Sequence, residues 1–153
     1  MSNISMTTSK RNAIVTVMLI SAFVSMLNQT ILNTALPAII KGLNITETTA
    51  QWLITGFMLV NGIMIPLTAF LMDKYSTRHL YIFSMAIFLI GSIIAAFSPT
   101  FTILMISRII QAIGAGILLP LMQFTVFTLF PAEQRGFAMG LAGVVVQLSL
   151  IHI

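Results

Sequence analysis

Long stretches without a charged residue constrain this chain more than any other feature of its sequence. The charged residues leave five uncharged runs, which cover residues 12–40, 48–72, 79–107, 109–132 and 136–153. About 20 apolar residues in a helix cross the hydrocarbon core of a bilayer, and each run approaches or exceeds that length. Only 7% of the residues are charged, whereas soluble domains average roughly 25%. We therefore predict an all-α integral membrane protein, which excludes a soluble enzyme and a DNA-binding domain.

Prolines and polar loops divide the chain into five predicted transmembrane helices. These helices cover about residues 12–36, 49–72, 80–97, 101–130 and 136–153. Because proline has no backbone N–H, we expect the first helix to end near Pro37, Pro66 to bend the second and Pro120 to interrupt the fourth. The number of helices is odd, and the last run is still apolar at Ile153. We therefore expect residues 1–153 to form a truncated, N-terminal helical bundle.

The basic residues divide unequally between the two expected sides of the membrane. The loop after the first helix carries Lys41, and the opposite side receives five basic residues: Lys10, Arg11, Lys74, Arg78 and Arg135. Cytoplasmic loops carry the excess of lysine and arginine, so we predict a multi-pass protein of the cell membrane with its N-terminus in the cytoplasm. The net charge of +4 thus reflects topology, and we expect the lipid bilayer, and no nucleic acid, as a partner.

Arg108 is the clearest candidate for a functional residue. A guanidinium inside a transmembrane helix costs at least about 2.5–3.5 kcal/mol and usually faces a partner or a cavity. If Pro37 and Pro99 mark the same membrane edge, Asn28 on the first helix and Arg108 on the fourth lie at equal depth. The same arithmetic pairs Ser25 with Gln111 and Ser21 with Ala115. We predict a substrate cavity lined by these stripes; the alternative is that Arg108 and Gln111 only join helices through hydrogen bonds.

Glycines on the last two helices favour close packing. Gly114 and Gly116 lie on the fourth predicted helix, and Gly136 and Gly140 lie on the fifth. Small residues let transmembrane helices approach each other closely. We therefore assign these four positions to helix packing rather than to chemistry.

The sequence offers no residues typical of an intramembrane enzyme. It has no cysteine, its two histidines are His79 and His152, and no acidic residue lies inside a predicted helix. Hydrolysis in a membrane needs a nucleophile with a base, paired carboxylates or a metal site. We therefore expect no enzyme activity, no metal site and no cofactor.

Three segments resemble motifs of one transporter family. Residues 27–37, Leu-Asn-Gln-Thr-Ile-Leu-Asn-Thr-Ala-Leu-Pro, resemble Leu-Asp-x-Thr-Ile-Val-Asn-x-Ala-Leu-Pro. The motif Gly-x-Leu-x-Asp-Arg-x-Gly-Arg-Arg is matched by Leu71, Asp73, Lys74, Tyr75 and Arg78, with Ala69, Ser76 and Thr77 as departures. Arg-x-x-Gln-Gly-x-Gly is matched by Arg108, Gln111, Gly114 and Gly116, with Ala112 as the departure. The chain thus resembles the N-terminal part of the fourteen-helix EmrB/QacA drug:proton antiporters of the major facilitator superfamily, and is most similar to the lincomycin-efflux type.

The resemblance implies both a fold and an activity. Helix triplets are related as inverted repeats, so that the first and fourth helices line a central cavity. The intact protein would export drug-like amphipathic compounds, contribute to antibiotic resistance and use the proton gradient as its energy source. The resemblance also implies that Asp73, with Lys74 and Arg78, acts in conformational gating by meeting the C-terminal half of the transporter, which this chain lacks.

One departure concerns proton coupling. The family motif usually has an aspartate where this chain has Asn28, so the expected acid opposite Arg108 is missing. We expect the coupling acid to lie in the C-terminal portion, and the fragment alone to be inactive. The alternatives to a transporter are a small membrane protein that assembles with partner helices and, behind it, an intramembrane enzyme.

Overall fold

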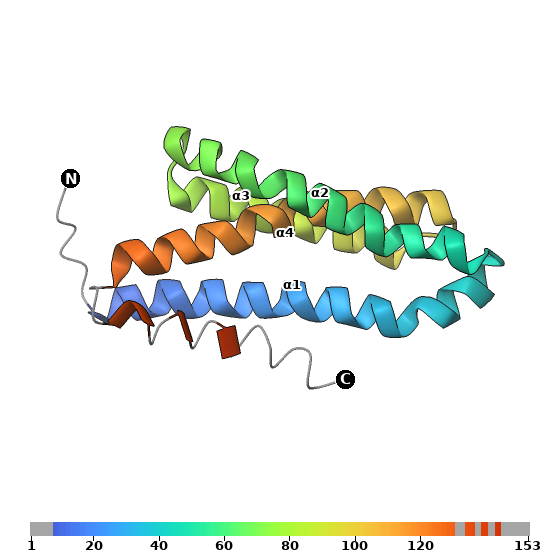
Figure 1. The fold of residues 1–153 in the computed structure, drawn as a ribbon, viewed down its shortest axis with the longest axis horizontal. Coiled ribbons are helices and arrows are strands. Elements are labelled where there is room, and N and C mark those ends of the chain that lie inside the picture. Colours follow the sequence, from blue (N-terminus) through green and yellow to red (C-terminus); the bar gives the residue numbers. More distant parts are fainter. Residues whose placement is uncertain (1–7, 131–133, 137–138, 141–142, 145–153) are drawn as a thin grey trace.

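The computed structural model describes residues 8–130, 134–136, 139–140 and 143–144, and four long helices account for most of them. The helices are α1 (Thr8–Leu43), α2 (Glu47–Lys74), α3 (Thr77–Ala96) and α4 (Phe101–Leu129). Figure 1 shows that they run roughly antiparallel in chain order, with short connections at the two ends of the bundle. Residues 134–136, 139–140 and 143–144 are also helical, and the rest of the predicted helix 136–153 lies outside the described residues.

All four helices are long and apolar enough to cross a membrane. The shortest, α3, has 20 residues, which corresponds to about 30 Å of helix and matches the hydrocarbon thickness. Large apolar side chains point outward along the helices, among them Val17, Ile31, Leu59 and Leu89. A water-soluble bundle would not expose such faces, whereas lipid accommodates them. The chain is therefore an all-α, multi-pass membrane protein.

The end of α1 differs from the prediction. The sequence favoured a stop near Pro37, but the helix continues through Pro37 to Leu43, so Lys41 lies in its last turn rather than in a loop. A proline ring fits helical φ angles and removes only one hydrogen bond, which a helix of 36 residues tolerates. Asn44 adopts a positive φ of 52° and ends the helix, since asparagine enters the left-handed region more easily than most residues.

Short polar connections join the remaining helices. Thr46 caps α2 by accepting a hydrogen bond from the backbone N–H of Thr49 at 3.2 Å, and Thr100 caps α4 through the N–H of Ile103 at 3.4 Å. Only Tyr75 and Ser76 separate α2 from α3, which begins earlier than predicted. The predicted interruption at Pro120 is wrong, because α4 is assigned as one helix across it; α2 likewise runs across Pro66.

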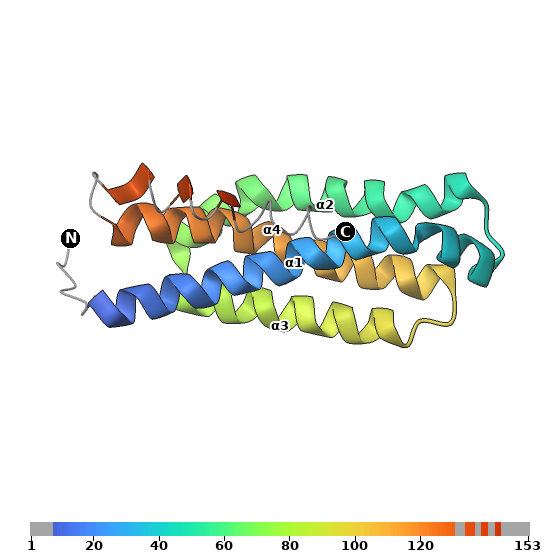
Figure 2. The ribbon, with the colours of Figure 1, turned by 90° about the horizontal axis from the view of Figure 1, so that it is seen from below.

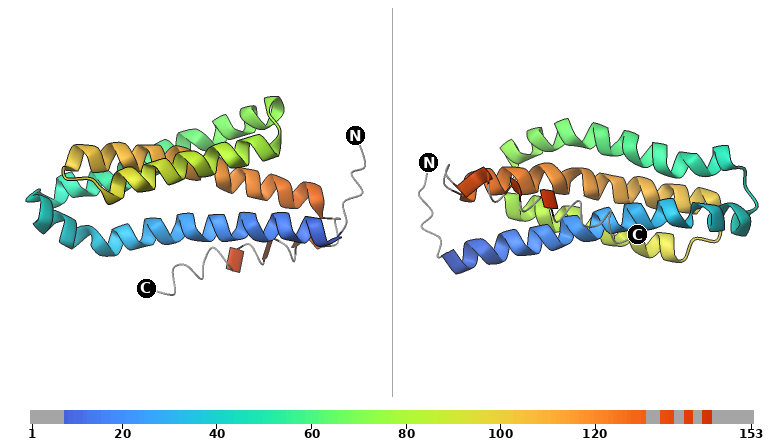
Figure 3. Two further views of the ribbon diagram at one scale, coloured as in Figure 1. Left: turned by 180° about the vertical axis from the view of Figure 1, so that it is seen from behind. Right: turned by 60° about the horizontal axis from the view of Figure 1, so that its bottom comes forward.

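Helix α4 is the centre of the bundle. It packs against α1, α2 and α3, and most extensively against α3, whereas the other helices contact one another far less. Figure 2 shows α4 between α2 and α3 with α1 crossing it, and the right-hand view of Figure 3 shows the same order from another side. Its buried side chains Ile117, Leu118, Leu121 and Val126 form one core with Met18, Leu19 and Ala22 of α1. A polar residue on the inner face of α4 is therefore enclosed by protein.

Candidate functional site

Arg108 lies on the inner face of α4 and joins it to α1. Its side chain is 2% exposed. The Nη1 atom donates to Asn28 Oδ1 at 2.9 Å and to Gln111 Oε1 at 2.9 Å. The two residues that the sequence placed at equal depth therefore face each other across the α1–α4 interface. Because arginine only donates hydrogen bonds, the contact fixes which atom of the Asn28 amide points toward it.

The other faces of the guanidinium meet α2 and apolar protein. The ring of Phe57 lies 4.3 Å from the guanidinium carbon, which is a cation–π distance. Phe57 is itself 2% exposed, and its ring is thus held in place by packing. The Nε atom of Arg108 is buried and has no hydrogen-bond partner among the described residues. The buried cation is therefore only partly compensated, by two amide oxygens and one ring.

Gln111 extends this network to α3. Its Nε2 donates to the Ser92 hydroxyl at 3.1 Å, and Ser92 in turn donates to the Phe88 carbonyl. Gly91 makes the approach possible, because a Cβ atom there would lie 2.7 Å from Gln111 Cγ and 3.0 Å from the Ser107 carbonyl oxygen. Arg108, Asn28, Gln111 and Ser92 thus form a polar network across α1, α3 and α4, which we call the Arg108 network.

The remaining predicted cavity residues lie elsewhere along α1. The Ser21 hydroxyl hydrogen-bonds to the Tyr81 hydroxyl of α3 and to the Val17 carbonyl. Ser21 and Ser25 line a narrow gap with α3 and α4 residues that include Ala115, and the gap has no room for a water molecule. Gln111, which the depth arithmetic matched with Ser25, directs its amide to Arg108 and to Ser92 of α3. In this conformation the described side chains pack against one another, so an open substrate cavity stays a prediction.

Two glycines of α4 lie at close helix contacts. A Cβ atom at Gly114 would lie 2.6 Å from the Ser84 carbonyl oxygen of α3. At Gly116 it would lie 2.5 Å from Met64 Cβ of α2 and 2.9 Å from Asn61 Oδ1. For Gly136 and Gly140 the described structure has no atom within 4 Å of such a Cβ, so their role in packing stays a prediction.

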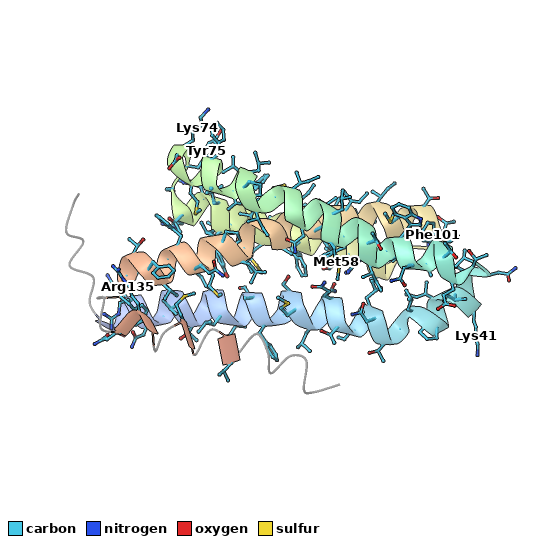
Figure 4. All side chains as sticks on the ribbon, in the orientation of Figure 1. Lys41, Met58, Lys74, Tyr75, Phe101 and Arg135 are labelled. Atoms are coloured by element: carbon cyan, nitrogen blue, oxygen red, sulfur yellow. The ribbon has the colours of Figure 1, made fainter. Side chains whose placement is uncertain are left out.

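The predicted gating residues lie far from the Arg108 network. Asp73 and Lys74 end α2, Arg78 lies in the first turn of α3, and all three are exposed. Figure 4 shows Lys74 and Tyr75 at one end of the bundle and Lys41 at the other. The Lys74 ammonium lies 4.5 Å from the Phe70 ring centre. Their role toward a C-terminal half stays a prediction.

Three contributors to the site were missed by the sequence reasoning. Phe57 is one of many apolar residues on α2, Ser92 is one of several hydroxyl residues, and Gly91 has no motif. Only the spacing along α3 and α4 could have placed Gly91 and Ser92 opposite Gln111. Within the described part of the chain, no group of three or more His, Cys, Asp or Glu residues could hold a metal ion.

Comparison with known proteins identifies similar chains along almost the whole length. Residues 18–151 match the family model described as Major Facilitator Superfamily. The MFS-type transporter YcnB of Bacillus subtilis (strain 168) is 52% identical over 139 residues, which are 91% of this chain and 29% of YcnB. The lincomycin resistance protein LmrB of the same organism is 43% identical over 86% of this chain and 28% of LmrB.

A third relative carries a different substrate in its name. The riboflavin transporter RibZ of Clostridioides difficile (strain 630) is 37% identical over 85% of this chain and 28% of RibZ. The chain therefore spans less than a third of the length of the curated relatives it matches.

Proposed function

Because the chain belongs to the Major Facilitator Superfamily of transporters, we propose that the intact protein exports drug-like amphipathic compounds in exchange for protons. Residues 1–153 then supply N-terminal helices of the transport path. The similarity to a lincomycin resistance protein supports the drug-like substrate class. The remainder of the transporter is the partner that this chain needs, and the fragment alone does not transport.

The Arg108 network is the observation that carries this proposal. Membrane-embedded arginines are expensive, and they commonly mark substrate or ion pathways. Here the guanidinium lies at the contact between α1 and α4. In transporters built from inverted repeats, substrate sites lie near the bilayer midplane at repeat interfaces. A purely structural role is less consistent with this residue, since neutral interhelical hydrogen bonds join helices at a much lower insertion cost.

The packing of the bundle is suited to alternating access. Helix α4 holds α1, α2 and α3 around it through close glycine contacts and a continuous apolar core. Such a unit can rock as one body against a second unit, which is the motion by which many secondary transporters expose a midplane site to each side in turn. Asp73, Lys74 and Arg78 lie at the end of the bundle where we propose the two halves meet in the gated state.

A small membrane protein that assembles with partner helices without transporting anything is the second candidate. The exposed apolar faces of α1 to α3 are compatible with either function. A stable complex with no effect of any ligand would favour this candidate.

Transport by the full-length protein in inside-out membrane vesicles tests the proposal. With an imposed proton gradient, the wild type should accumulate lincomycin, and Arg108→Ala should abolish accumulation while its expression and gel-filtration profile stay unchanged. The accumulation of riboflavin is measured in the same way, as the alternative substrate. If neither compound moves, or if Arg108→Ala transports at the wild-type rate, the proposed function is wrong. The variant Lys41→Arg, which keeps the charge at an exposed position at the opposite end of the bundle from the gating residues, controls for general effects of mutation.

A further inference from the structure

The charge of Arg108 has no matching carboxylate among the described residues. Two acidic residues belong to the described helices: Glu47 begins α2 and Asp73 lies one position before its end. Phe57, the α2 residue that contacts Arg108, is ten residues from Glu47 and sixteen from Asp73, which corresponds to about 15 Å and 24 Å along the helix axis. The third acidic residue, Glu133, lies outside the described residues and 25 positions after Arg108 in the sequence.

Several hydrogen-bond donors at the site are left over. Arg108 Nε has no hydrogen-bond partner among the described residues, and it is buried, since the whole residue is only 2% exposed. Asn28 uses its Oδ1 to accept from Arg108, so its Nδ2 donor points elsewhere, and no described residue accepts from it. A buried donor without a partner, such as Arg108 Nε, is unfavourable. The site therefore presents one positive charge and unused donors, and every acceptor that the described structure supplies to it is neutral.

An aspartate at position 28 would change both the charge and the hydrogen-bond character of the site. A carboxylate would neutralise the guanidinium and would offer acceptors in place of the amide donor. Asparagine has nearly the same shape, so it preserves the contact with Arg108 and changes the charge and the hydrogen-bond character. Asn28 is also the partly exposed member of the pair, whereas Arg108 is enclosed. The amide is therefore the more accessible of the two groups.

We propose that Arg108 and Asn28 bind the negatively charged group of an amphipathic ligand, so that this transporter prefers anionic compounds over cationic ones. The proposal deepens the proposed function and rests on it, because it assigns a charge to the ligand of the same site. A carboxylate or sulfonate accepts from the Asn28 Nδ2 donor and supplies the counter-charge that α1 to α4 do not. The Phe57 ring beside the guanidinium then packs against the apolar part of the ligand.

Two dyes of one skeleton test the charge preference. Carboxyfluorescein is an anionic xanthene and rhodamine 123 a cationic one, so their comparison holds size and aromatic surface nearly constant. Binding to the purified full-length protein is measured by fluorescence anisotropy, and transport is measured in inside-out vesicles. The wild type should bind the anionic dye at least about tenfold more tightly than the cationic dye, because the desolvated charge of Arg108 attracts an anion and repels a cation.

Asn28→Asp should remove or reverse this preference. The variant adds the neutralising carboxylate with little change in volume, so affinity for the anionic dye should fall about tenfold while affinity for the cationic dye rises. Asn33→Asp is the matched control: it places the same charge on an exposed position of α1 and should leave the affinity ratio unchanged. The wild-type comparison alone decides the question if Asn28→Asp fails to fold.

The possible results separate this inference from the proposed function. Tighter binding of the anionic dye without transport supports the inference and contradicts the proposed function. Transport with equal binding of the two dyes, or with preference for the cationic dye, overturns the inference and leaves the proposed function intact. In that case a carboxylate of the protein itself balances Arg108. Absence of binding by either dye also overturns it.

Discussion

At the scale of single residues, Arg108 shows how a buried cation is held by neutral groups. Two amide oxygens and an aromatic face surround the guanidinium. Each such contact stabilises the guanidinium less than an ion pair with a carboxylate would. A desolvated cation–π contact contributes about 2 kcal/mol. The three contacts come from α1, α2 and α4 itself, so the cation also records the relative positions of these helices.

We predict that Phe57→Leu lowers the melting temperature of the full-length protein in detergent. Loss of the cation–π contact and of ring packing should cost about 2–4 kcal/mol in total. Phe97→Leu is the control, because Phe97 is 82% exposed at the end of α3 and its loss should have little effect. In an Arg108→Met background, the effect of Phe57→Leu should shrink, since the cation is gone. An equal effect in both backgrounds would show that Phe57 acts through packing alone.

At the scale of helices, the sequence predicted the number and type of the first four elements but not all of their ends. Uncharged runs are long and their meaning in a bilayer is unambiguous, which explains the success. The predicted end of α1 was wrong because Pro37 does not stop the helix. The helix ends instead at Asn44, which has a left-handed backbone conformation. Equal depth brought Asn28 and Arg108 together, but it could not predict that the Gln111 amide bonds to Ser92 of α3, because depth says nothing about the direction in which a side chain points around the helix.

The close contact between α3 and α4 leads to a prediction at Gly114. Gly114→Ala would bring a Cβ atom to 2.6 Å from the Ser84 carbonyl and 3.0 Å from the Phe88 nitrogen, both backbone atoms of α3. The helices must separate, so the melting temperature of the full-length protein should fall by several degrees, as for overpacking that costs about 1–3 kcal/mol. Gly62→Ala is the matched control, because its Cβ meets no atom within 4 Å. If the two variants melt together, α3 and α4 are not this close.

At the scale of the molecule, the ends of the bundle carry different charge. Figure 4 shows Lys74 and Arg135 at one end and Lys41 at the other, and that the first end faces the cytoplasm stays a prediction. We predict that a membrane-impermeant maleimide labels Lys41→Cys in intact cells, whereas Arg78→Cys reacts only after permeabilisation. This chain has no cysteine of its own. Labelling of both positions in intact cells would contradict the topology.

The energy source of the whole transporter sets the last prediction. The two acidic residues of the described helices, Glu47 and Asp73, lie at opposite ends of α2. Between these two levels, the described helices contain no carboxylate that could carry a proton. The Asn28 amide does not titrate, and a guanidinium keeps its charge in proteins. Asp73 is exposed at the end of the bundle, where it cannot carry a proton across the barrier. Glu133, the remaining acidic residue of the chain, falls between two predicted helices, so we predict that the coupling acid lies in the part of the transporter beyond residue 153.

The test replaces each downstream membrane carboxylate of the full-length protein by its amide and measures substrate movement in vesicles. One such variant should lose transport driven by a pH gradient while it still exchanges labelled for unlabelled substrate, because exchange needs the binding site but no net proton movement. Asp73→Asn should slow both processes equally, since gating serves both. If Asp73→Asn alone abolishes pH-driven transport and spares exchange, the proton path runs through the helices described here, and the prediction is wrong.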